Sequence, residues 1–133
     1  MLSIREIAAV PDLGAAPAIE EIHGAVWEAF PVRSGGLWYC RFIDGTRTVS
    51  KHGYQDVGWK GAAEDIFVTT GGMPELVDVA EYIVAQTKNG NLEAQTVIVD
   101  QDIWSPESGW RVYGGTRHTH VHVDSLGGRP CSP

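Results

Sequence analysis

Residues 117–124 have the sequence Arg-His-Thr-His-Val-His-Val-Asp, which gives the clearest indication of the fold. Successive side chains of a β-strand point to opposite faces of the sheet. One face of this strand therefore carries His118, His120, His122 and Asp124, and the other carries Thr119, Val121 and Val123. Buried imidazoles usually occur singly, and each needs partners. We expect the valine side to join the core and the histidine side to carry polar chemistry.

Hydrophobic periodicity and turn signals divide the rest of the chain into short elements. Apolar residues at helical spacing predict helices at residues 18–29 and 74–88. Branched and aromatic runs predict strands at 37–43, 46–50, 63–69 and 97–99, and a final hairpin made of 110–113 and 118–123. Residues 51–62 are expected to be irregular, and residues 100–109 to form a loop. Hairpins without regular βαβ alternation predict an α+β fold, with a small antiparallel sheet and two or three helices.

Length, charge and cysteine content restrict the class of protein. The 133 residues fit one domain, which we place at residues 18–133 after an N-terminal arm at 1–17. The formal net charge of -7 repels phosphate backbones, so we expect no nucleic-acid partner. No apolar run reaches the roughly 18 residues of a bilayer span, and no signal peptide is evident, which predicts synthesis in a cytoplasm without a membrane partner. Cys40 and Cys131 are compatible with one disulfide or with two thiols.

Histidines together with one carboxylate suggest a metal site. Neutral imidazole is the commonest protein ligand for zinc. Asp65 stands directly before the apolar run Ile66-Phe67-Val68, and a carboxylate buried there needs a cation or strong donors. A metal ion would meet that need, and a salt bridge or a turn cap would also meet it. The histidine strand likewise has an alternative interpretation, as an exposed polar face.

Three sequence elements resemble a known family. Ser50-x-His52, Gly61-x-Ala63-x-Asp65 and His122-Val123-Asp124 are similar to motifs of zinc D-Ala-D-Ala carboxypeptidases and phage L-Ala-D-Glu endopeptidases, which share a fold with hedgehog signalling domains. The resemblance covers residues 47–126. It implies a hedgehog-like, DD-peptidase-like fold in which His52, Asp65 and His122 bind Zn2+ and leave one coordination position open. It also implies a peptidase of peptidoglycan stem peptides or cross-links, such as a phage lysis or virion protein acting on the cell wall.

The resemblance also implies roles for other residues. His120 is similar to the histidine that stays free in the His-x-His pair of hedgehog domains, and we expect it to exchange protons with the attacking water. Asp124 would orient His122 or His120 as an outer-shell carboxylate. Arg47 would pair with a substrate carboxylate, or would be an ordinary surface charge. The family places an acid shortly before its last ligand, whereas here no Asp or Glu lies between residues 109 and 122.

Two further functions fit the sequence. The first is a non-catalytic, zinc-stabilised structural or binding module of a phage particle, which the missing acid favours. The second is a cupin-like or carbonic-anhydrase-like metal site made by the His-x-His strand with another ligand, which gives His118 or His120 as a ligand and no role to His52 or Asp65. The spacing between these last two residues is also longer than in the family, so residues 54–60 are expected to loop out.

Overall fold

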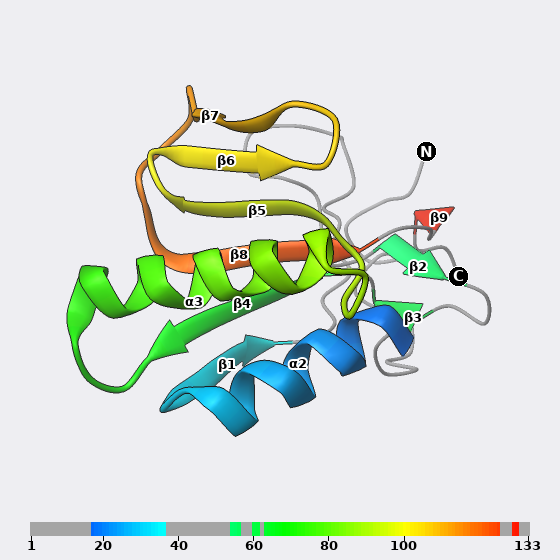
Figure 1. Cartoon of the computed structure of the whole chain (residues 1–133), viewed down its shortest axis with the longest axis horizontal. Coiled ribbons are helices and arrows are strands. Elements are labelled where there is room, and N and C mark those ends of the chain that lie inside the picture. The colour runs from blue at the N-terminus through cyan, green and yellow to red at the C-terminus, as the bar shows by residue number, and fades with distance from the viewer. Residues whose placement is uncertain (1–16, 37–53, 57–59, 62, 126–128, 131–133) are drawn as a thin grey trace, which may run out of the picture.

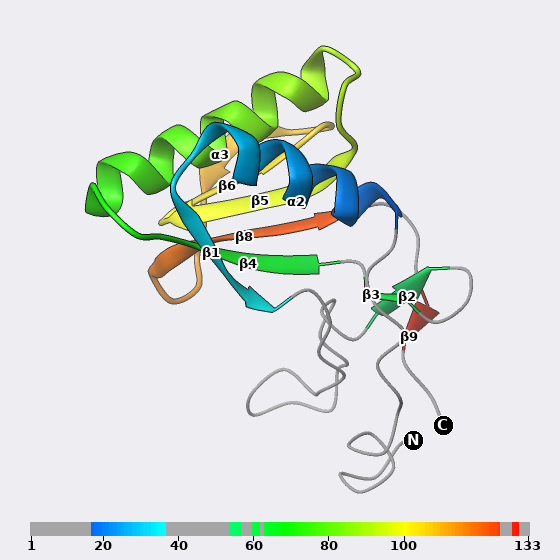
Figure 2. The same cartoon turned by 90° about the horizontal axis from the view of Figure 1, so that it is seen from below.

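The computed structural model describes residues 17–36, 54–56, 60–61, 63–125 and 129–130. In this part of the chain, two helices cover one face of a six-stranded antiparallel sheet (Figures 1 and 2). The helices are α2 (Pro17–Ala29) and α3 (Gly72–Lys88). The strands of this sheet are β1 (Val32–Gly36), β4 (Ala63–Val68), β5 (Ala94–Asp100), β6 (Asp102–Ser105), β7 (Gly109–Val112) and β8 (His118–Ser125). The predicted α+β class with a small antiparallel sheet is confirmed.

Strand β8 lies inside the sheet, whose order is β1-β4-β8-β5-β6-β7. The predicted final hairpin is therefore wrong, because β7 pairs with β6 while β8 pairs with β4 and β5. The predicted loop at residues 100–109 is also wrong, since it contains β6 and a turn that ends at Gly109 with φ of 66°. This turn folds β7 back along β6 and leaves β7 at the edge. The chain then returns from the edge to the interior of the sheet, where β8 begins (Figure 1).

The core lies between the helices and the covered side of the sheet, which we call the helix face. Its buried side chains come from both helices and from alternate positions of the inner strands, among them Ile22, Ile83, Ile66, Val97, Val121 and Val123. Val121 and Val123 have 0% exposure, so the valine side of β8 is in the core as predicted. Full burial of an aliphatic side chain of this size contributes roughly 1.5–3 kcal/mol.

One polar pair interrupts the apolar helix face. Glu64 on β4 is fully buried, and its Oε2 lies 2.9 Å from Nδ1 of His23 on α2. The His23 ring stacks on Trp27 in the next helical turn, with ring centroids 3.8 Å apart. Because a buried carboxylate requires a partner of this kind, the pair ties α2 to β4.

The helices lie where the apolar spacing places them, with a shift at one end. Helix α3 begins two residues before the predicted start, after Gly71, which adopts a left-handed φ of 78°. Pro74 is therefore the third helical residue instead of the first. It still lies in the first turn, where a backbone N–H has no intrahelical acceptor and its absence costs nothing. Neither of the two described helices has the length and apolar character needed to cross a bilayer.

Three short strands form a second sheet in the order β3-β2-β9. They are β2 (Tyr54–Asp56), β3 (Lys60–Gly61) and β9 (Arg129–Pro130). The described parts of the segment that was expected to be irregular and to loop out are thus paired strands. The reason is that the backbone of Gln55 has a partner on each side, Gly61 on β3 and Arg129 on β9.

Several predicted segments differ from the structure or fall outside its described part. Strand β1 was not predicted, because its sequence Val-Arg-Ser-Gly-Gly has a single branched apolar residue. Strand β5 extends the predicted 97–99 strand at both ends. The predicted strands 37–43 and 46–50 lie outside the described residues. The predicted arm at 1–17 also lies outside them, except for Pro17, which begins α2.

Candidate functional site

The side of the sheet opposite the helices carries the polar residues of β8. Alternation along β4 and β8 places on this side Asp65, Phe67, His118, His120, His122 and Asp124, which together we call the histidine face. Asp65 and His122 are direct cross-strand partners in the β4–β8 ladder. Opposite residues in such a ladder have Cβ atoms about 4.5–5.5 Å apart. The backbone register alone therefore brings the two side chains together.

One carboxylate oxygen of Asp65 lies close to two imidazole rings. Its Oδ1 is 3.3 Å from Nδ1 of His122 and also 3.3 Å from Nε2 of His120. The side chains of Asp65, His120 and His122 are 26%, 25% and 16% exposed. Three of the predicted site residues thus meet at one point that solvent can still reach.

Asp124 contacts the other nitrogen of His122. Its Oδ2 lies 3.1 Å from Nε2 of His122, and its side chain is only 3% exposed. The ring of His122 is therefore held between two carboxylates, one at each nitrogen. A carboxylate in this position fixes the orientation of an imidazole ring.

The two carboxylates determine the charge of His122. Burial lowers the pKa of the ring, but the hydrogen bonds to Asp124 and Asp65, together with their negative charges, outweigh it and raise the pKa to about 9. In this arrangement the ring is an imidazolium at neutral pH and donates one N–H to each carboxylate. Because metal ligands must be deprotonated, a metal ion at Nδ1 would displace one of these protons.

His118 lies farther along the same strand. Its ring centroid is 5.2 Å from that of His120, and Tyr113 meets the ring edge-on at 5.1 Å. Nδ1 of His118 lies 3.0 Å from the carbonyl oxygen of Thr116. Burial lowers the pKa of His118 by more than this carbonyl raises it, so the ring is neutral near pH 7. His118 thus adds a neutral donor or acceptor beside the charged His122.

Two residues that the sequence analysis did not select border the site. Phe67 stacks on His120 with ring centroids 5.0 Å apart, and the guanidinium carbon of Arg33 lies 4.5 Å from the centroid of Phe67. Phe67 was accessible to sequence reasoning, because it lies two positions after Asp65 on the same strand. Arg33 was not, since only the register of β1 with β4 places it opposite Phe67.

The remaining predicted site residues, His52 and Arg47, lie outside the described residues. Within the described ranges, no group of three or more His, Cys, Asp or Glu side chains is arranged to hold a metal ion. Two ligand atoms bound to tetrahedral zinc at about 2.0–2.1 Å lie about 3.3–3.4 Å apart. The separation between Asp65 Oδ1 and His122 Nδ1 is 3.3 Å. This separation is compatible with two ligands of one zinc ion.

Comparisons of the chain with protein-family models, with curated proteins and with solved structures found no match. No relative therefore assigns a function to the chain. The arrangement of side chains around Asp65 is therefore the only basis for a function among the described residues.

Proposed function

We propose that this chain is a zinc-dependent peptidase that hydrolyses peptide bonds of peptidoglycan, as a phage lysis or virion protein. In this proposal Asp65 and His122 bind the zinc ion together with His52. The observation that carries the proposal is the meeting of Asp65 Oδ1 with two imidazole nitrogens, of His120 and His122, each at 3.3 Å. Two His and one carboxylate, with one position left open, are a known ligand set of catalytic zinc.

The two imidazoles are equally close to Asp65, and their other contacts support different roles. His122 has Asp124 at its second nitrogen, which is the outer-shell partner that metal-bound histidines almost always have. His120 packs against Phe67 instead and is the more exposed of the two rings. We therefore assign His122 as the metal ligand and His120 as the residue that carries protons.

The proposed chemistry divides between the metal and the side chains. When bound, zinc would supply a water activated near neutral pH and would polarise the scissile carbonyl. His120 accepts a proton from the attacking water at Nε2 and returns it to the leaving amine. Asp124 keeps the His122 ring in position through Nε2. Arg47 would pair with a carboxylate of the substrate, as the family resemblance implies.

The experiment combines elemental analysis of the purified protein with a digest of cross-linked muropeptides. We expect about one equivalent of zinc and chelator-sensitive cleavage in the wild type. Asp65→Ala should lose both zinc and cleavage, whereas His120→Ala should keep zinc and lose cleavage. Asp78→Ala, which removes an exposed aspartate on α3, is the matched control and should keep both. Full zinc content in Asp65→Ala would contradict the proposal and favour a site made by the His-x-His strand of β8 with another ligand.

A non-catalytic zinc-stabilised module of a phage particle is the second candidate. One observation favours it: Asp124 is shielded from solvent and hydrogen-bonded to His122, so it is not placed to act as a general base. The module predicts one equivalent of zinc and a higher Tm with the metal than without it. It also predicts that the wild-type protein cleaves no cell-wall preparation.

A further inference from the structure

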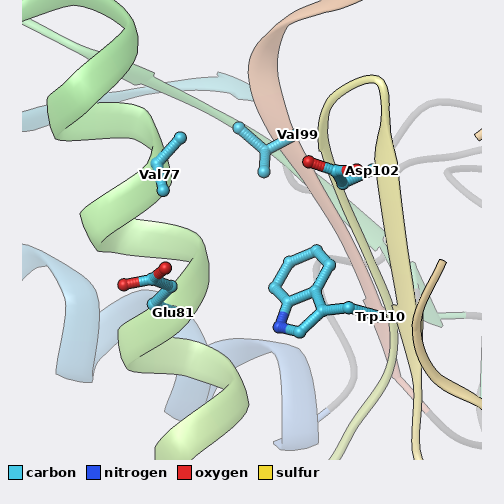
Figure 3. A pocket seen from close by; sticks show the side chains of 5 residues that line it. All are labelled: Val77, Glu81, Val99, Asp102 and Trp110. Atoms are coloured by element: carbon cyan, nitrogen blue, oxygen red, sulfur yellow. The ribbon is translucent and has the colours of Figure 1, made fainter. Parts of the chain in front are cut away.

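A pocket of about 220 Å³ lies on the helix face, near the edge of the sheet that is formed by β6 and β7. Its described lining residues are Val77 and Glu81 of α3, Val99 of β5, Asp102 of β6 and Trp110 of β7. Figure 3 shows Val77 and Glu81 on the helix side and Val99, Asp102 and Trp110 on the sheet side. The histidine face lies on the opposite side of the sheet, so the pocket is separate from the candidate zinc site.

The pocket exists because the sheet extends beyond the helices. Helix α3 packs mainly against β5 and β8 and leaves the outer two strands less covered. Trp104 on β6 and Trp110 on β7 are cross-strand partners, yet Trp104 is 2% exposed and Trp110 is 39% exposed. Val112, two positions farther along β7, is 81% exposed. An indole face at this edge is therefore available to a ligand.

The residues that line the pocket favour a ligand with a positively charged group at the end of an apolar chain. Glu81 and Asp102 bring two carboxylates to opposite sides of the pocket (Figure 3), and none of its five lining residues is basic. The face of a tryptophan attracts ammonium and guanidinium groups. Val77 and Val99 offer apolar contacts for methylene groups, as long basic side chains require. The volume is smaller than the roughly 300–1,000 Å³ of typical small-molecule sites, which suits a single side chain.

We propose that this pocket binds the side chain of a lysine or arginine from a peptide ligand. The cation lies between the carboxylates of Glu81 and Asp102 and against the indole of Trp110, and its methylene groups contact the two valines. The inference does not depend on the zinc peptidase proposal, because none of these residues belongs to the histidine face.

The test measures binding of three small probes to the full chain by NMR titration of backbone and indole N–H signals. The probes are Nα-acetyl-lysine-N-methylamide, the arginine equivalent, and the norleucine equivalent, which has a similar shape without the charge. We expect the better cationic probe to bind about tenfold more tightly than norleucine at low salt, as one cation–π contact and two exposed ion pairs would give. The largest shifts should include the Trp110 indole N–H. High salt should reduce the difference.

Two sets of variants locate the binding. Glu81→Gln combined with Asp102→Asn should lower the affinity for the cationic probes to that for norleucine. Trp110→Ala should weaken all three probes, and Trp110→Phe should restore part of the affinity. Asp78→Asn is the matched control, because it removes one charge from an exposed position of the same helix without lining the pocket.

Several results would overturn the inference. The first is equal affinity for norleucine and both cationic probes. The second is a preference for the cations that persists in the Glu81→Gln and Asp102→Asn double variant, which would place binding elsewhere. The third is a loss of affinity in Asp78→Asn as large as in Glu81→Gln made as a single change, which would indicate only the general attraction of an acidic protein. Asp78 and Glu81 are both exposed, so we expect their variants to fold and the comparison to remain measurable.

Discussion

The two faces of the six-stranded sheet differ in what their side chains do, although the same strands supply both. On the helix face, Ile66, Val121 and Val123 are fully buried under α2 and α3. On the histidine face, Asp65 and His122 remain partly exposed and form polar contacts across the same two strands. The pairing of β4 with β8 therefore supplies core residues on one face of the sheet and a cluster of polar side chains on the other. A change at one residue should therefore affect one property, and a change at its neighbour should affect the other.

The largest expected effect is on metal binding at the histidine face. Asp65→Ala removes a proposed ligand, so its zinc affinity should fall by more than the 10- to 100-fold that loss of an outer-shell partner typically costs. The measurement is a competition titration of zinc against a chromophoric chelator. The far-UV circular dichroism of the variant should match that of the wild type. An unchanged zinc affinity would remove Asp65 from the site.

The adjacent residue tests the opposite face. Ile66→Ala opens a cavity in the core and should lower the free energy of unfolding by about 2–5 kcal/mol, measured by urea denaturation of the metal-free protein. Its zinc stoichiometry should stay near that of the wild type under native conditions. If Ile66→Ala lost zinc while still folded, the two faces would not be independent.

A pH titration of the metal-free protein examines the charge of His122. In the folded protein the pKa of His122 is about 9, above the ordinary 6.5. The protonated ring therefore stabilises the folded state fully below pH 6.5, and this contribution to the free energy of unfolding is lost as the pH rises through 9. The expected decrease is at most roughly 3 kcal/mol between these values. Because other groups titrate in the same range, the quantity to compare is the difference between the wild type and His122→Gln. A flat difference would contradict the ion pairs with Asp65 and Asp124.

A smaller effect is expected from the carboxylate behind His122. Asp124→Asn keeps the shape of the side chain and removes its charge, and should reduce zinc affinity by about 10- to 100-fold, which is less than the loss in Asp65→Ala. The same competition titration measures both variants. If Asp124→Asn proved as damaging as Asp65→Ala, Asp124 would be acting as a ligand itself.

The smallest effect is expected at an exposed ion pair near the start of β8. Arg117 donates a hydrogen bond from Nε to Asp100, and the two side chains are 58% and 36% exposed. Arg117→Ala should therefore lower the free energy of unfolding by less than about 1 kcal/mol. A larger loss by urea denaturation would mean that this pair holds β8 in its register with β5.

Sequence reasoning succeeded where the signal is local. Alternation alone assigned the two sides of β8, and apolar spacing located α2 and α3. It failed for β6, because this four-residue strand, Asp102–Ser105, begins and ends with a polar residue, which is typical of a loop. It also failed for the partner of β8, because the short Gly-rich connection after β7 has the form of a hairpin turn although the chain crosses to another part of the sheet.

The amino-acid pattern of residues 117–124 is enough to show that one strand has a valine side and a histidine side, since the period of two is a property of the extended backbone. In contrast, no local pattern predicts that Asp65 lies opposite His122, that Arg33 contacts Phe67, or that Trp110 lines a pocket. These contacts depend on which strands pair and in which register. Asp65 and His122 belong to segments more than fifty residues apart in the chain. Their pairing depends on burying the whole helix face at once, so neither segment taken alone predicts it.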